Sequence, residues 1–122
     1  MPRDSHDTAA PDTLLPLRSI ETLILTMLAA GDRHGYGIQQ DILDHSHGHI
    51  ELEAGSLYRL IRRMEGEGLI EASAARRAND DDRRIYYRLS PFGRRVIAAE
   101  MLRLRELVRL AEDRRLIAPA RA

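Results

Sequence analysis

The spacing of apolar residues changes twice along this chain, and these changes restrict the folds that it can adopt. Between residues 17 and 65, apolar side chains recur every three or four positions, as in short amphipathic helices. Ile85, Tyr87 and Leu89 then occupy every second position, which is the period of a strand with those side chains facing inward. Helical spacing returns afterwards and continues to about residue 116. The sequence therefore predicts a mainly α-helical fold with a small β-hairpin.

Turn and cap residues mark where the elements begin and end. Gly31, Gly66 and Gly68 are helix stop signals, and Ser90 and Pro91 suit the N-cap and first position of the last helix. We expect helices at residues 17–30, 36–44, 54–65 and 91–116, a brief strand at 50–52, and hairpin strands at 69–74 and 84–89. Three helices followed by a two-stranded hairpin are the plan of a winged helix-turn-helix domain, here with a long C-terminal helix added.

Composition excludes several classes of protein. The 122 residues suffice for one small domain, and the absence of cysteine excludes disulfides and cysteine-bound metal. No apolar run is long enough to span a bilayer, and the N-terminus lacks the apolar segment of a secretory signal. We therefore expect a cytoplasmic protein with no membrane contact.

The formal net charge is zero, so any DNA-binding surface must come from the local placement of the basic residues, all of which are arginine.

Four short motifs, in matching order and spacing, resemble those of the PadR family of transcriptional regulators. They are HGYGI at residues 34–38, GSLYRLI at 55–61, MEGEGLI at 64–70 and RIYYRLSPFG at 84–93. The short chain with one C-terminal helix is similar to the compact subgroup of that family. Two positions depart from the family pattern: Arg59 stands where proline is frequent, and the hairpin tip reads Asn79-Asp80-Asp81-Asp82 where basic residues are frequent.

The residue pattern and the resemblance together imply three parts and one function. Residues 1–13 are expected to be an unstructured tail, 14–90 a winged-helix DNA-binding domain, and 91–118 a dimerisation helix. The implied function is sequence-specific DNA binding at an inverted-repeat operator by a homodimer. Repression, relieved by a small-molecule effector at the dimer interface, is also implied by the resemblance. The alternative is a winged-helix module that binds another protein and not DNA.

The third helix carries the main candidate residues for DNA recognition. Leu57, Leu60, Ile61 and Met64 form one apolar stripe, so the arginines and Tyr58 face outward. Arginine forms bidentate contacts with guanine and phosphate, and a helix of this kind fits the major groove. A solvated charged helix is the other interpretation of the pattern alone. The candidate DNA-binding residues are Tyr36, Gln39, Gln40, Ser56, Tyr58, Arg59, Arg62, Arg63, Arg76, Arg77, Arg83 and Arg84.

Two of these groups have open alternatives. Tyr36, at the start of the second helix, is either near the DNA backbone or a partly buried structural ring. The arginines of the hairpin flank three aspartates, which either oppose contact with DNA or pair with those arginines when DNA is absent.

The last helix has an apolar stripe that a small domain cannot cover alone. Its apolar residues recur at alternating spacings of four and three, which suits a partner helix. Packing against the chain's own first helix is the alternative, and a core shared between both helices combines the two. The candidate interface residues are Leu17, Ile20, Ile24, Ile97, Met101, Leu104, Val108 and Ala111.

The sequence contains no pattern typical of an enzyme. Ser56 has no evident histidine and acid partners, and there is no glycine-rich phosphate loop. His45, His47 and His49 alternate in a loop, which is not the helical spacing of a strong metal site. We therefore expect neither catalysis nor a metal or other cofactor.

Overall fold

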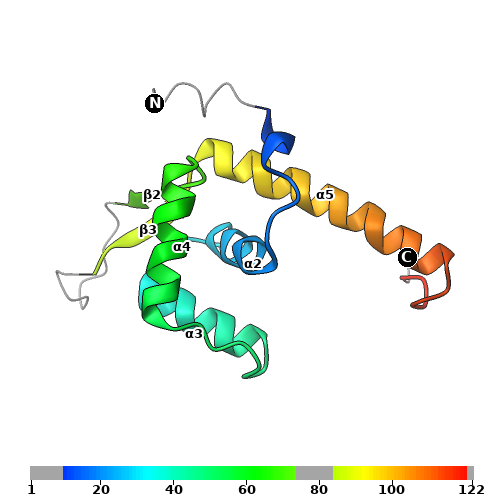
Figure 1. Cartoon of the computed structure of the whole chain (residues 1–122), viewed down its shortest axis with the longest axis horizontal. Coiled ribbons are helices and arrows are strands. Elements are labelled where there is room, and N and C mark those ends of the chain that lie inside the picture. Colours follow the sequence, from blue (N-terminus) through cyan, green and yellow to red (C-terminus); the bar gives the residue numbers. More distant parts are fainter. Residues whose placement is uncertain (1–9, 74–83, 121–122) are drawn as a thin grey trace.

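A computed structural model of the chain describes residues 10–73 and 84–120. In chain order the elements are the 3-10 turn η1 (Pro11–Leu14), α2 (Ser19–Leu28), β1 (Arg33–His34), α3 (Gly35–His45), α4 (Ala54–Gly66), β2 (Ile70–Ser73), β3 (Tyr86–Leu89) and α5 (Pro91–Asp113). α2 lies at the centre, with α3 and α4 beside it and α5 running away from the body (Figure 1). The expected winged-helix fold, mainly helical with a small sheet, is confirmed.

The core lies where α2, α3 and α4 meet. Leu25, Ile38, Leu57 and Met64 are completely buried, and Ile61 is buried to nearly the same degree. On α4 these residues are three or four positions apart, so the apolar stripe expected for this helix forms its inner face. The opposite face of α4 is left to solvent.

The sheet has three antiparallel strands in the order β1-β3-β2, one more than the hairpin alone. β3 is central: Tyr87 pairs with Ala72 of β2 on one side and with Arg33 of β1 on the other. The brief strand expected at residues 50–52 is wrong. Ser46 Oγ accepts the Ile50 N–H and Gln39 Nε2 donates to the Leu52 carbonyl, so side chains, not a strand, bind this backbone.

The expected inward set of the second hairpin strand is partly wrong. Tyr87 and Leu89 are buried as expected, but Ile85 is 53% exposed and Tyr86 is buried. The ring of His34 packs edge-on against Tyr86 with ring centroids 5.1 Å apart, and these two residues are paired between β1 and β3. Ile85 precedes β3, which begins at Tyr86.

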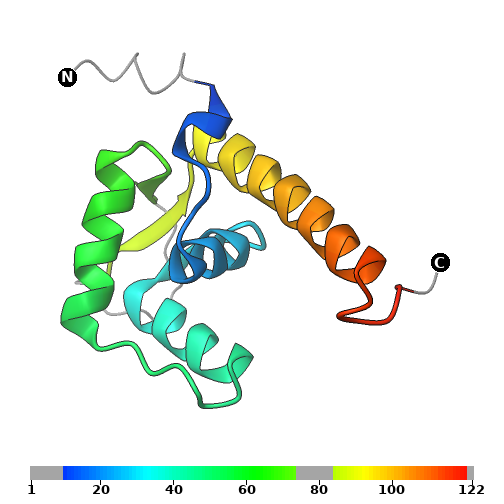
Figure 2. The same ribbon diagram turned by 45° about the vertical axis from the view of Figure 1, so that its right-hand side comes forward.

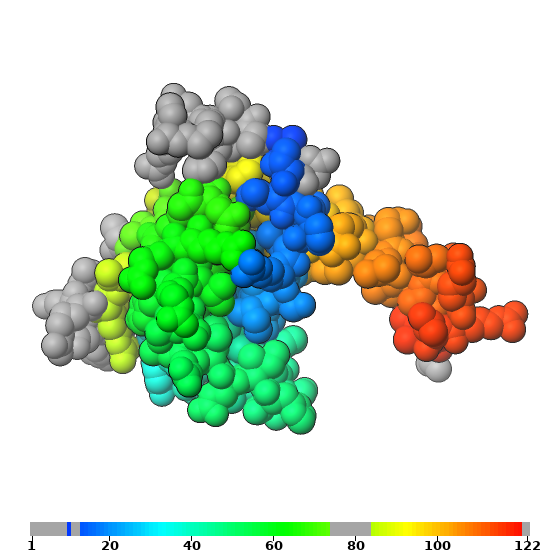
Figure 3. Space-filling model, viewed as in Figure 1, coloured from blue at the N-terminus to red at the C-terminus, as the bar shows by residue number. Residues whose placement is uncertain are grey.

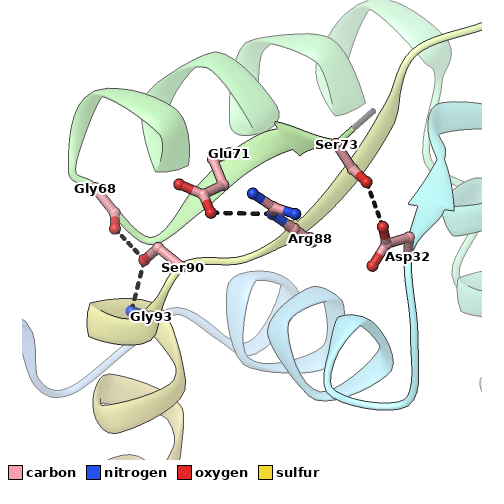
Figure 4. Close-up of polar contacts among 7 residues, drawn as sticks. All are labelled: Asp32, Gly68, Glu71, Ser73, Arg88, Ser90 and Gly93. Carbon is pink, nitrogen blue, oxygen red and sulfur yellow. Dashed lines mark hydrogen bonds and ion pairs between the residues drawn. The ribbon is translucent and has the colours of Figure 1, made fainter. Parts of the chain in front are cut away.

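A compact junction joins α4, the sheet and α5 (Figure 4). α4 ends at Gly66, and Gly68, two residues further on, has a φ of 79°, which glycine adopts readily. Ser90 is the N-cap of α5, as expected: its Oγ accepts the Gly93 N–H at 2.8 Å and donates to the Gly68 carbonyl. Pro91 is the first helical residue. A Cβ placed on Gly93 would lie 1.9 Å from the Leu69 carbonyl oxygen, so the two backbones touch directly here.

Two further polar contacts hold the sheet in place (Figure 4). Arg88 Nε of β3 lies 3.0 Å from Glu71 Oε1 of β2, across the strand pair. Ser73 Oγ donates to Asp32 Oδ2, which connects the end of β2 to the turn before β1. These contacts therefore join β2 to β3 and join β2 to the body of the domain.

The segment before α2 packs on α5. The tail was expected to lack structure as far as Thr13, but the turn η1 begins at Pro11 and contacts α5, whereas residues 1–9 lie outside the described ranges. The Leu17 N–H donates to Glu100 Oε2 at 2.9 Å, and Glu100 is only 1% exposed. Hydrogen bonds from Arg103 lower the pKa of Glu100; burial opposes this effect, and the bond from Leu17 adds to it.

α5 leaves the body after its first three turns (Figure 2). Its buried residues end at Glu100, and from Met101 to Leu110 only Leu104 is partly covered. The helix ends at Asp113, and Arg115 follows with a φ of 62°. The expected end near residue 116 is therefore a few residues too late.

Two of the expected interface residues are buried inside the protomer itself. Ile24 is 0% exposed and Ile97 is 6% exposed, because α2 and the first half of α5 pack on the same core. The chain's own core therefore covers these two side chains in this conformation. Leu17, Ile20, Leu104 and Ala111 are partly covered, whereas Met101 and Val108 are exposed.

The Gly93 contact leads to the first prediction. Gly93→Ala should destabilise the fold by about 3 kcal/mol or more, because the new methyl group overlaps the Leu69 backbone, which cannot move as a side chain can. Urea unfolding followed by circular dichroism measures this effect. Gly66→Ala is the control: this helical glycine has open space around it, so alanine should be neutral or stabilising there by about 0.5–1 kcal/mol. Equal stability of Gly93→Ala and wild type would contradict the prediction.

Candidate nucleic-acid interface

The outward face of α4 carries an aromatic side chain and three arginines. Tyr58 is 42% exposed, and Arg59, Arg62 and Arg63 are exposed. Arg63 pairs with Glu67 at 3.4 Å, and Arg59 donates to Ser56 Oγ at 3.1 Å. Among the described residues, neither Arg59 nor Arg62 has a carboxylate partner. Within the described part of the chain, no acid therefore neutralises these two guanidinium groups.

α3 begins directly against this face. A Cβ placed on Gly35 would lie 2.6 Å from the Tyr58 hydroxyl oxygen, so the ring of Tyr58 lies over the first residue of α3. The glycine allows the N-terminus of α3 and the outer side of α4 to form one surface.

His34 organises the N-terminus of α3, although the candidate residues from the sequence do not include it. Its Nδ1 accepts the Gly37 N–H at 3.0 Å, which is an N-cap hydrogen bond. The same ring is stacked with Tyr36 at a centroid distance of 6.4 Å. Its Nε2 lies 3.3 Å from Arg84 Nη1. In the sequence, His34 stands directly before Gly35, which is the first helical residue, and this position could have indicated an N-cap. Histidine is not among the usual N-cap residues, so this role was not predicted.

Two adjoining hollows bring several expected residues together at this point. Both are lined by His34, Tyr36 and Arg84, while Gln40 contributes to one and Tyr58 to the other. Tyr36 is 57% exposed, and its ring is also stacked with His34, so it combines an accessible hydroxyl side with a structural contact. The surface thus combines hydroxyl groups, an imidazole and a guanidinium at a helix N-terminus, where backbone N–H groups favour anions.

Among the described residues, the remaining candidates for DNA binding do not line these two hollows. The Gln39 amide is used inside the protomer, since it donates to the Leu52 carbonyl at 2.8 Å. Ser56 is partly buried beneath Arg59. Arg76, Arg77 and Arg83, like the aspartates of the hairpin tip, lie outside the described residues, so their contact with DNA stays a prediction.

Tyr87 lies behind this surface and keeps its proton. Burial raises the pKa of its hydroxyl, the nearby Glu65 carboxylate and Tyr58 add to the increase, and Arg62 acts in the opposite direction. Tyr58 and Tyr87 line the same hollow, which places this end of α4 beside β3.

Within the described ranges there is no group of three or more metal-binding side chains, so His45, His47 and His49 do not form one. No helix there has the length and apolar character needed to cross a membrane.

Comparison with known proteins identifies relatives of this arrangement. Residues 24–99 match the model of the transcriptional regulator PadR-like family. Protein X of Lysinibacillus sphaericus is 29% identical over 75 residues, which is 62% of this chain and 68% of that protein.

Solved structures share the fold. A transcriptional regulator from Clostridium thermocellum has a TM-score of 0.65 at 23% identity, over 87% of this chain and 97% of the other. A PadR family regulator from Clostridium difficile has a TM-score of 0.66 at 24% identity, over 79% and 97%. The Bacillus subtilis PadR, solved with operator DNA, has a TM-score of 0.58 at 19% identity, over 70% and 48%.

The cap made by His34 gives a second prediction. His34→Ala should lower the free energy of unfolding by about 1 kcal/mol, because the Gly37 N–H loses its acceptor. His34→Asn should recover most of this loss, since asparagine also caps helices, although it lacks the ring. Urea unfolding of the three proteins at pH 7 compares these values. If asparagine were no better than alanine, the contribution of His34 would come from its ring contacts and not from the cap.

Proposed function

Because the chain belongs to the PadR-like family of transcriptional regulators, we propose that it binds operator DNA as a homodimer and represses transcription. The observation that carries this proposal is the outward face of α4, where Arg59 and Arg62 are exposed without a carboxylate partner among the described residues. Other arginines, such as Arg63 and Arg88, are paired with acids. In a chain with no net charge, this difference gives α4 a locally basic outer side that suits the major groove.

The surface beside α4 supplies phosphate contacts. Because His34 Nδ1 accepts the Gly37 N–H, the neutral ring carries its hydrogen on Nε2. His34 Nε2 lies 3.3 Å from Arg84 Nη1, so this ring and a guanidinium charge lie side by side at the N-terminus of α3, an arrangement that suits a phosphate. The Tyr36 hydroxyl and the N-terminus of α3 add to the same hollow. Such contacts fix the register of α4 on DNA without reading the sequence.

A second copy of the chain covers the distal part of α5 in this proposal. Leu107, Val108 and Leu110 are about half exposed on a part of the helix that stands clear of the body (Figure 3). At roughly 100° per residue, Leu104, Leu107 and Ala111 continue the face that Val96 and Ile97 bury nearer the start. A two-fold dimer built on this face presents two copies of α4 to an inverted repeat, with half-sites about 34 Å apart.

A small-molecule effector that relieves repression belongs to the same proposal. Its expected place is the dimer interface, and the chain has no tryptophan, so leucine and methionine side chains line any cavity there.

Titration with the DNA upstream of the protein's own gene tests the function, against a scrambled duplex of equal length at two salt concentrations. DNA binding predicts a preference for the upstream sequence and an affinity that falls with salt. The alternative, a module that binds another protein, predicts no salt-dependent DNA affinity. A reporter gene behind the same upstream region separates repression from activation.

Removal of one arginine from α4 should weaken DNA binding. If Arg62 contacts a base, Arg62→Ala should weaken the binding free energy at the preferred sequence by about 1–3 kcal/mol. If it contacts a phosphate, the slope of log affinity against log salt concentration should instead become smaller in magnitude by about one. Arg105→Ala removes the same charge from an exposed position on α5 and serves as the control. Equal effects of both variants in fluorescence-anisotropy titrations would argue against a direct role for α4.

A charge on the distal face of α5 should weaken dimerisation. Leu107→Glu places carboxylates near their symmetry mates in an apolar interface. The dissociation constant of the dimer should therefore rise by at least about tenfold, and the affinity for the operator should fall with it. Leu102→Glu is the matched control, because Leu102 is equally exposed but lies about 140° away around the helix. Light scattering and DNA titration on the same samples measure both effects. Wild type that is monomeric at micromolar concentration yet binds tightly would contradict the dimer.

A further inference from the structure

Glu100 stands at the point where α5 leaves its own domain. The buried residues of this helix are Phe92, Gly93, Val96, Ile97 and Glu100. The next three residues, from Met101 to Arg103, are all exposed. Glu100 therefore belongs to the last turn that packs against the body, and the direction of the distal helix is set at this turn.

The contacts of Glu100 differ from those of the other buried residues of α5. Its Oε2 accepts the Leu17 N–H at 2.9 Å and an Arg103 N–H at 3.1 Å, and Arg103 Nε donates to Oε1. Leu17 is 83 positions earlier in the sequence and lies two residues before α2. A buried carboxylate is costly unless it is hydrogen-bonded, so an apolar side chain would serve simple packing better. The role of the Glu100 carboxylate is therefore to hold the backbone of Leu17 in place.

Of its two partners, only Leu17 belongs to another part of the fold. Arg103 is on α5 itself, three residues further on, and its side chain is 39% exposed. It orients the carboxylate but does not connect α5 to another element. The Leu17 N–H makes that connection, because residue 17 leads directly into the central helix α2.

We propose that Glu100 is a positioning residue for operator recognition. By holding the backbone at Leu17, it fixes the direction of the distal part of α5 relative to the body, and so the spacing of half-sites that the dimer accepts. This inference rests on the proposed function, since it concerns the same dimer and the same DNA.

The geometry makes half-site spacing sensitive to this direction. From Met101 to Asp113, at ~1.5 Å per residue, the projecting helix is roughly 20 Å long. A rotation of about 10° at Glu100 would therefore displace its end relative to α4 by about 3 Å, close to the ~3.4 Å rise of one base pair. A small change in this angle is enough to change which spacing fits best.

Glu100→Gln tests the proposal, because it keeps the size of the side chain but removes the charge that holds Leu17 and Arg103. A duplex library selected with the wild-type protein supplies the preferred inverted repeat, and derived duplexes carry one base pair more or less between the half-sites. For wild type, one added or removed base pair should weaken binding by about tenfold or more. For Glu100→Gln the loss should be below about threefold, with dimerisation and helix content unchanged. Hydrogen exchange at the Leu17 amide should also become faster.

Glu106→Gln is the matched control. Glu106 is on the same helix and pairs with Arg109 three residues on, at 2.8 Å, but it is exposed and binds nothing outside α5 among the described residues. It should keep the wild-type preference for spacing. A Glu100→Gln protein that also keeps it, while remaining folded and dimeric, would overturn the proposal.

A second variant covers the case in which Glu100→Gln does not fold. Glu100→Asp keeps the charge but is one methylene too short to reach Leu17 from the same position, so it should also broaden the accepted spacings. Retention of the wild-type preference by this variant would overturn the proposal. Failure of the proposed function would be distinct: the wild-type protein would then select no inverted repeat from the library.

Discussion

The backbone contact between Gly93 and the Leu69 carbonyl group is the constraint on which the rest of the structure depends. Leu69 follows the end of α4, and Gly93 lies in the first turn of α5, so the contact joins both helices and the start of the sheet. No side chain lies between the two backbones, so repacking of side chains cannot change their separation. The cap at Ser90 and the turn at Gly68 fix the same point from either side. The outer face of α4 and the first turn of α5 therefore have a fixed relation at their common junction.

The sequence predicted those parts of the fold that depend on local periodicity and capping. The stripe of α4, the N-cap at Ser90 and the central strand of the hairpin follow from the spacing of apolar residues and the preferences of turn residues. β1 was not predicted, because two residues carry no period and are defined only by pairing with β3. His34 of that strand packs on Tyr86, and Ile85 precedes β3, so the expected alternation fails at the start of the strand.

The candidate DNA surface was predictable in part for a related reason. Tyr58, Arg59 and Arg62 follow from the helix period, since each must face away from a stripe that is buried. Gln39 was expected on this surface, but its amide is required by the Leu52 carbonyl, a partner that no local pattern indicates. His34 was missed because its role combines a cap with ring contacts to residues on two other elements. Non-local hydrogen bonds thus decide which polar residues are available to a ligand.

The projecting half of α5 has a consequence for the folding of this protein. An isolated helix of about 13 residues is marginal in water, but here the packed half provides the nucleus from which the remaining turns extend. Arg115, two residues after the end of the helix, is in the left-handed conformation, which is unfavourable for a residue with a Cβ. These turns are thus the least stable part of the helix in a lone chain, and a partner helix would order them as it binds. In such a molecule the final step of folding and the assembly of two chains are the same event.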